Sequence, residues 1–218
     1  MSLIVLEGLD GSGKSTQLPL LEEALRQQGP VRTISFPDYQ SPSSALVKMY
    51  LGGEFGSSPE AVNPYAAGAF YAVDRYASYK QHWERDYQAG TTILAGRYVT
   101  SNLIYQMEKL PESRWEDYIA WTEAFEYDRL GLPRPDQVIF LDMPVEVSQK
   151  LLLKRYEGQE SKKDLHERDT AFLERCGRCA RFAAARLGWK VVPCAEGDSL
   201  SSVEEIHQRV LDALMIRG

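Results

Sequence analysis

Long hydrophobic runs are missing from this chain of 218 residues, and cysteine is scarce. No apolar stretch approaches the about 20 residues of a membrane-spanning helix. The apolar start at residues 3–6 runs straight into Glu7 and is too short for the core of a signal peptide. Three cysteines provide no disulfide framework, and an odd count suits a reducing compartment. We therefore expect a cytoplasmic protein that does not act on membranes.

Positive charge is also in short supply. The sequence holds 25 Lys and Arg residues against 31 Asp and Glu residues, for a formal net charge of −6. This balance opposes broad electrostatic binding to nucleic acid, so any anion site must be local. Two motifs are absent as well. The sequence has no Asn-Lys-x-Asp guanine motif, and the pair Cys176 and Cys179 has no second cysteine pair with which to form a zinc site.

Apolar segments alternate with helical patterns along the chain. A continuous apolar run at residues 3–6 predicts a buried parallel strand, and four further strands are predicted at residues 31–36, 91–95, 138–141 and 190–192. Helical spacing of apolar side chains predicts helices between and after them, at residues 18–25, 63–88, 113–130, 145–154, 166–187 and 203–216. Such alternation predicts an α/β fold, a three-layer sandwich in which helices cover both faces of a five-stranded parallel sheet. The length fits a single domain over residues 1–218.

The strongest motif lies between the first predicted strand and the first predicted helix. Residues 8–15 read Gly-Leu-Asp-Gly-Ser-Gly-Lys-Ser, which fits the phosphate-binding pattern G-x-x-x-x-G-K-[ST]. Glycines let backbone N–H groups surround phosphate oxygens, and the helix N-terminus adds its partial positive charge. We expect Lys14 to reach the terminal phosphates and the Ser15 hydroxyl to bind Mg²⁺. Asp10 either orients a substrate hydroxyl or a metal-bound water, or serves only as a turn residue.

The motif predicts a site for a nucleoside triphosphate together with Mg²⁺. The expected ATP-binding residues are Gly8, Leu9, Asp10, Gly11, Ser12, Gly13, Lys14, Ser15 and Thr16. GTPases, ATPase motors and small-molecule kinases all use such a loop. Because the chain lacks the guanine motif and the bulk of a typical motor, the sequence favours a small phosphotransferase.

Four blocks in order along the chain carry a family resemblance. They are residues 7–16 around the loop, 36–39 (Phe-Pro-Asp-Tyr), 70–75 (Phe-Tyr-Ala-Val-Asp-Arg) and 96–102 (Gly-Arg-Tyr-Val-Thr-Ser-Asn), the last followed by Tyr105. With these blocks the chain resembles the thymidylate kinases, which transfer phosphate from ATP to dTMP. The resemblance implies the P-loop kinase fold with a short mobile lid, dTMP and ATP as substrates, Mg²⁺ as cofactor, and a homodimer.

The resemblance also implies an acceptor site. Tyr71 matches the position that stacks an aromatic ring on thymine, and Arg75, one helical turn on, is placed to donate to a base carbonyl. Without the resemblance, Tyr71 is better explained as a core aromatic, and the alternative for Arg75 is a surface ion pair with Asp74 or a nearby acid. The implied substrate-binding residues are Asp10, Phe36, Pro37, Tyr39, Tyr71, Arg75, Arg97, Ser101, Asn102 and Tyr105.

Five further positions have a specific role by resemblance. Arg97 would bridge the acceptor phosphate and the transferring phosphoryl group. Asn102 matches a position that contacts the base. Tyr105 matches the one that stands against the 2′ carbon of the sugar, where a ribose hydroxyl would clash. Phe36 and Pro37 would wall the slot for the base.

The polar stretch at residues 154–169 is open to two interpretations. Composition alone favours a solvated helix and loop, whereas the resemblance favours a lid at about 154–168. The phosphate loop carries no arginine, so the resemblance places the compensating cation in the lid. The candidates are Arg155, Lys162, Lys163 and Arg168. The expected catalytic residues are then Lys14, Arg97, Asp10, Arg155 and Arg168.

Gly96 is the clearest departure from the family pattern, which has Asp before this arginine, near the metal and its waters. Glycine supplies no ligand and allows backbone torsions in which Asp would be strained. Two alternatives to a thymidylate kinase stay open, and Gly96 motivates the second of them. One is a deoxynucleoside kinase on the same fold, with Asp38 as its carboxylate base, and the other is a degraded kinase that binds nucleotide without turnover. Arg75, Asn102 and Tyr105 favour the monophosphate acceptor.

Overall fold

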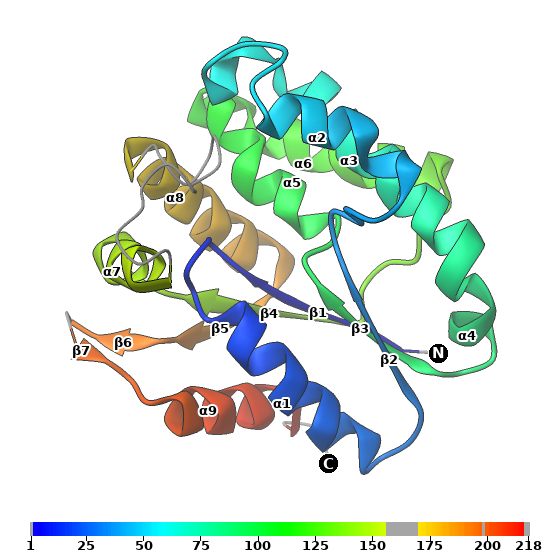
Figure 1. Ribbon diagram of the computed structural model, residues 1–218, viewed down its shortest axis with the longest axis vertical. Helices are drawn as coiled ribbons and strands as arrows, with labels where there is room; N and C mark the ends of the chain where they lie inside the picture. Colours follow the sequence, from blue (N-terminus) through cyan, green and yellow to red (C-terminus); the bar gives the residue numbers. More distant parts are fainter. Residues whose placement is uncertain (1, 156–169, 198, 216–218) are drawn as a thin grey trace.

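The computed structural model describes residues 2–155, 170–197 and 199–215 (Figure 1). Its centre is a five-stranded parallel sheet in the order β2-β3-β1-β4-β5. The strands are β1 (Ser2–Gly8), β2 (Val31–Ser35), β3 (Thr92–Gly96), β4 (Gln137–Asp142) and β5 (Lys190–Pro193). The predicted fold class and all five predicted strands are confirmed, with small shifts at the strand ends.

Side chains of the central strand β1 alternate between two hydrophobic cores. Leu3 and Val5 belong to one core, together with residues of β3 and β4. Ile4 and Leu6 belong to the other core, again with partners from β3 and β4. Because both faces are buried, β1 reads in the sequence as a continuous apolar run rather than as an alternating one.

Helices cover both faces of the sheet, as Figure 1 shows. The core that contains Ile4 and Leu6 is closed by α1 (Lys14–Arg26), α7 (Val145–Arg155) and α9 (Val203–Met215). The other core is closed by α5 (Thr100–Tyr105), α6 (Trp115–Glu123) and α8 (Thr170–Leu187). Helices α2 (Ala45–Leu51), α3 (Pro64–Ser78) and α4 (Glu84–Gln88) lie on the same side as α5 and α6. Over the described ranges, no helix is long and apolar enough to cross a membrane.

The long helix predicted at 63–88 is helical throughout but consists of three pieces. A π-helical turn, Tyr79–Trp83, joins α3 to α4, and a second one, Ala124–Arg129, extends α6. Such wide turns leave no mark in a periodicity of 3.6 residues. Helices α2 and α5 and the hairpin of β6 (Ala195–Glu196) and β7 (Ser199–Leu200) are too short to show a repeat, so the sequence does not predict them.

The parallel register gathers three loops at one edge of the sheet. Leu6 pairs with Gly96, and Gly8 pairs with Leu141, so the chain leaves β1, β3 and β4 at neighbouring points. Strand β2 ends beside them, with Ser35 opposite Gly96. Ligands of open α/β sheets bind at this carboxyl edge, which is where the predicted site residues come together.

Candidate active site

The loop between β1 and α1 is held tightly against α7. Gly11 and Gly13 have left-handed backbone torsions, with φ of +76° and +88°. A Cβ atom on Gly11 would lie 2.7 Å from the carbonyl oxygen of Ser148, and one on Gly8 would lie 2.3 Å from Ser12 Oγ. Larger residues are therefore excluded by contact and, at Gly11, by torsion as well. The loop leads directly into the N-terminus of α1, whose dipole favours an anion.

Lys14, the first residue of α1, lies inside this loop. Its Nζ donates hydrogen bonds to the carbonyl oxygens of Gly8 and Leu9, both at 2.7 Å. The predicted contact with terminal phosphates would replace these carbonyl oxygens by phosphate oxygens, which are stronger acceptors for an ammonium group.

Ser15 follows Lys14 and is exposed at the same helix end. Magnesium keeps several waters and substrate phosphates as ligands, so a single hydroxyl at this place fits its needs. A cluster of three or more His, Cys, Asp or Glu residues that could hold a metal alone is not found in the part of the chain that the structure describes. The single hydroxyl of Ser15 therefore suits a Mg²⁺ ion that binds together with the triphosphate.

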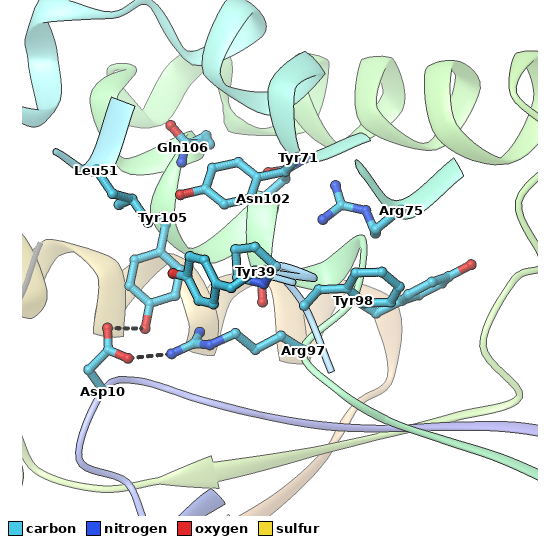
Figure 2. A pocket seen from close by; sticks show the side chains of 13 residues that line it. Asp10, Tyr39, Leu51, Tyr71, Arg75, Arg97, Tyr98, Asn102, Tyr105 and Gln106 are labelled. Atoms are coloured by element: carbon cyan, nitrogen blue, oxygen red, sulfur yellow. Dashed lines mark hydrogen bonds and ion pairs between the residues drawn. The ribbon is translucent and has the colours of Figure 1, made fainter. Parts of the chain in front are cut away.

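A pocket opens beside the loop, and Figure 2 shows its lining. It encloses about 510 Å³ of space, counting its open mouth. All ten residues predicted for substrate binding line this pocket, and Leu51, Tyr98 and Gln106 complete the wall. The side chains come from the phosphate loop, the segment after β2, the end of α2, helix α3, and the β3–α5 segment. Their contacts with a ligand remain predictions.

Asp10 joins the phosphate loop to the pocket. Arg97 Nη2 donates to its Oδ1 at 2.5 Å, and Tyr105 Oη donates to its Oδ2 at 3.0 Å (Figure 2). Burial raises the pKa of Tyr105 well above its usual range, so the phenol stays protonated and keeps donating. Asp10 therefore organises two pocket residues and is more than a turn residue.

The backbone of Arg97 has a left-handed torsion, with φ of +67°. Such a torsion is costly for a residue with a Cβ unless its neighbours hold it. The residues that follow Arg97 are held by Glu7, a fully buried residue of β1. Its Oε1 accepts the backbone N–H of Tyr98 at 3.2 Å. The hydroxyls of Thr100 and Ser101 donate to the same oxygen at 2.7 Å, so the predicted substrate ligand Ser101 is tied to Glu7.

A second buried network stands behind the pocket. Arg75 donates from Nε and Nη2 to the two carboxylate oxygens of Glu126 at 2.7 and 2.6 Å, and both side chains are 1% exposed. The alternative that Arg75 forms a surface ion pair with Asp74 is therefore wrong. Asn102 Nδ2 also donates to Glu126, at 2.8 Å. The remaining nitrogen of Arg75, Nη1, has no hydrogen bond among the described residues, and Arg75 lines the pocket.

The sequence pattern does not reveal two residues that shape this site. Gln106 is 1% exposed and lines the pocket, and its Oε1 has no hydrogen-bond partner within the described residues. A buried acceptor without a donor costs free energy, which marks a place for a ligand's N–H or O–H group. In the sequence, the only feature that points to Gln106 is its position next to Tyr105. Glu126 lies inside a predicted helix with no motif around it.

The segment after β2 is attached to α3 by another buried carboxylate. Asp74 accepts the backbone N–H of Asp38 at 2.8 Å and the hydroxyl of Ser43 at 2.5 Å. This attachment keeps Phe36 and Pro37 in the pocket wall. Asp38 itself is not among the described residues that line the pocket, which counts against its use as the base of a nucleoside kinase.

A second cavity borders the same loop. Leu9 lines it together with residues at the end of β4, in α8 and after β5. Arg181 of α8 donates to Asp142 at 3.0 Å at its edge. Adjacent loop residues, Leu9 and Asp10, therefore line two different cavities, as the two substrates of a transfer reaction require.

The lid candidates Lys162, Lys163 and Arg168 lie outside the described residues, and of Arg155 only the backbone at the end of α7 is described.

Gly96 does not share the left-handed torsion of Arg97. A Cβ atom at this position would point towards α1, 3.1 Å from Leu18 Cδ2 and 3.5 Å from Ser35 Oγ. Leu18 lies one helical turn after Ser15, so an acid at position 96 would enter the space beside the predicted metal ligand. The close contact involves the flexible end of a leucine, which can move by a few tenths of an ångström.

The buried pair of Arg75 and Glu126 gives a stability prediction. Glu126→Ala should lower the free energy of unfolding by about 3–5 kcal/mol, because it leaves the Arg75 charge buried without a partner. Urea unfolding followed by circular dichroism measures the loss. Glu123→Ala is the matched control, because its partner Arg134 is 51% exposed, and it should cost under about 1 kcal/mol. Equal losses in the two variants would contradict this account of the buried pair.

Comparisons with known proteins agree with this geometry. The family model described as thymidylate kinase matches residues 6–210. The chain is 33% identical over 192 residues to a thymidylate kinase of Mycobacterium tuberculosis, which covers 86% of this chain and 87% of that protein. It is 29% identical over 221 residues to thymidylate kinase of Homo sapiens, with 99% and 92% covered. A solved thymidylate kinase structure from Candida albicans has a similar fold, with a TM-score of 0.70 and 20% identity over 98% of this chain and 90% of that one. The chain therefore belongs to the thymidylate kinase family, a family of nucleoside monophosphate kinases.

Proposed function

We propose that this chain transfers the γ-phosphate of Mg·ATP to dTMP and releases ADP and dTDP. The observation that carries the proposal is the contact of Asp10 with Arg97 and Tyr105, where the phosphate loop meets the pocket. A kinase needs the donor phosphate and the acceptor phosphate within reach of one cation, and Arg97 lies at that junction. We place the reaction in the cytoplasm, where the three free, buried cysteines would stay reduced.

The pocket offers the groups that a thymine nucleotide requires. Tyr71 presents an aromatic ring on which thymine can stack. Arg75 Nη1 can donate to a ring carbonyl, and the buried Oε1 of Gln106 can accept from the ring N–H. Because Glu126 holds the rest of the guanidinium in place, the Arg75 donor is preorganised. We assign the exclusion of a 2′-hydroxyl to Tyr105, whose own hydroxyl is directed at Asp10.

Catalysis in this proposal is positioning and charge neutralisation, with no covalent bond to the protein. Lys14 would turn from its loop carbonyls to the phosphates of the donor, and Arg97 would neutralise charge between the two substrates. Bound Mg²⁺ would add positive charge on the donor phosphates, with the Ser15 hydroxyl as its protein ligand. We assign Arg155 and Arg168, two of the lid candidates, as further cations for this step on the basis of the family resemblance.

An assay of ADP release with dTMP and thymidine in parallel tests the proposed acceptor. The expected result is turnover with dTMP and none above background with thymidine, because the site is built for a monophosphate. Lys14→Ala should lower the dTMP rate by at least about 100-fold, since it removes the only cation of the loop. Equal use of thymidine would make the chain a nucleoside kinase. Absence of turnover with both would make it a nucleotide-binding protein that has lost catalysis.

Position 96 gives a prediction about magnesium. Gly96→Asp should lower the Mg²⁺ concentration for half-maximal rate, because a carboxylate beside Ser15 would hold metal-bound waters. The Mg²⁺ concentration at which ATP raises the melting temperature should fall in parallel. Gly96→Ala is the matched control, because it adds the contact with Leu18 but no carboxylate. Unchanged magnesium dependence in the Asp variant, at the wild-type melting temperature, would show that this carboxylate is unnecessary here.

We further propose that two copies of the chain pair through α3. Its buried side faces the pocket, while apolar residues at helical spacing on the other side are at least partly exposed: Ala66, Ala69, Phe70, Val73, Tyr76 and Ala77. Val73 and Tyr76 are 43% and 40% exposed. An exposed apolar stripe of this kind is typical of a subunit contact.

Sedimentation velocity tests this pairing. Val73→Glu should convert a wild-type dimer into a monomer, because it places a charge in the proposed contact. Val191→Glu, on the edge strand β5 at 47% exposure, should leave the dimer intact. A wild type that sediments as a monomer, or a dimer that persists in Val73→Glu, would exclude α3 as the contact.

A further inference from the structure

Lys109 is a largely buried cation behind the pocket, and the proposed reaction does not use it. It ends the 3₁₀ turn Met107–Lys109, which follows α5 and Gln106. Its Nζ donates to Tyr50 Oη at 2.9 Å and to the carbonyl oxygen of Val62 at 3.1 Å. The same nitrogen lies 4.9 Å from the centre of the Tyr50 ring. One ammonium group thus ties the end of α5 to α2 and to the segment that precedes α3.

Tyr50 connects this cation to the pocket wall. It is 1% exposed, and its ring meets that of Tyr71 edge-on, with centres 6.4 Å apart and an interplanar angle of 90°. Tyr71 is the proposed stacking ring, and Leu51, the next residue after Tyr50, also lines the pocket. A displacement of Tyr50 would therefore move two parts of the wall that faces the base.

Nearby acids favour the charge of Lys109 without forming an ion pair with it among the described residues. Glu108 and Glu60 both bind Arg175 of α8, at 2.6 and 3.1 Å, and within the described ranges no carboxylate pairs with Lys109. Cys176 of α8 also faces this region, and burial raises its pKa, so it is an uncharged thiol. The ammonium group relies instead on a hydroxyl, a carbonyl and an aromatic ring. Burial lowers the pKa of Lys109 to about 8.

Such a cation lowers stability at neutral pH. An unfolded lysine keeps its proton up to about pH 10.4, whereas Lys109 in the fold loses it near pH 8. Between these values the unfolded chain binds more protons, so this group makes folding more favourable as the pH rises. An apolar residue would avoid the desolvation cost. We therefore explain the charge of Lys109 by the residues that it holds in place.

We propose that Lys109 is a positioning residue for the acceptor: it fixes Tyr50, and through Tyr50 the ring of Tyr71, at the spacing that a pyrimidine base requires. The proposal rests on the proposed use of the pocket for dTMP. Lys109 follows the wall that α5 provides, and it binds α2 and the segment that leads into α3, so it sets the width of the slot between these walls.

Steady-state kinetics of Lys109→Met test this role. The KM for dTMP should rise by about fivefold or more, while kcat and the KM for ATP stay within about twofold, because only the acceptor wall is loosened. Lys109→Arg keeps a cation and should restore most of the dTMP affinity. Lys80→Met is the matched control, because Lys80 follows α3 but is 45% exposed and binds Glu84, and it should leave both KM values unchanged.

The pairing with Tyr50 and the effect of pH give two further readouts. Tyr50→Phe should raise the dTMP KM less than Lys109→Met does, and the double variant should be no worse than Lys109→Met alone, because both changes break one contact. The wild-type KM for dTMP should rise above about pH 8 as Lys109 loses its proton. This rise should be missing from Lys109→Met, in which Glu108, Glu60, Arg175 and Cys176 are unchanged.

Two results overturn the inference and are distinguishable from each other. If the wild type uses dTMP and Lys109→Met has the same dTMP KM, or loses ATP and dTMP affinity equally, Lys109 has no specific role at the acceptor wall. If the wild type neither binds dTMP in calorimetry nor turns it over, the proposed function fails, and the assignment of Lys109 fails with it.

Discussion

The buried carboxylate of Glu7 is the constraint on which the geometry of the site depends. A charge without solvent must find donors inside the protein, and those of Glu7 come from Tyr98, just before α5, and from the first two residues of α5. Glu7 itself stands at the end of the strand that leads into the phosphate loop. One side chain therefore sets the distance between the phosphate cradle and the helix that carries Asn102 and Tyr105. The left-handed torsion of Arg97 lies directly between these two anchored parts.

Two further carboxylates hold the pocket in the same manner, from behind its wall. Glu126 orients Arg75 and Asn102, and Asp74 attaches the segment after β2 to α3. Apolar packing would bring these walls into contact without fixing the direction of a guanidinium or an amide. Hydrogen bonds to a buried charge do fix the direction of these groups, although burying the charge costs desolvation free energy. The recognition surface is therefore shaped by acids that a ligand need not touch.

The parts of this arrangement that can be predicted from sequence are those encoded by neighbouring residues. The strands are recognisable because β1 and its partners are buried on both faces, and the phosphate loop because its glycines and Lys14 all lie within residues 8–14. The residues proposed to bind the acceptor are recognisable only through their resemblance to a family. Glu126 and Lys109 show no such signal, because their partners lie far away in the chain and similar residues on other helices are simply solvated. The torsion of Arg97 was equally hidden, since the adjacent Gly96 is the residue expected to adopt it.

The order of the strands in the sheet has a consequence for how the chain is made. Strand β1 leaves the ribosome first, yet its neighbours are β3, paired from Thr92, and β4, paired from Gln137. The N–H of Leu3 even donates to Asp136, 133 positions later. During synthesis this apolar strand therefore has open edges until β3 and β4 follow, and unpaired strand edges are prone to mispairing. The phosphate loop is attached to that strand, and the α7 residue against which Gly11 packs, Ser148, is translated much later.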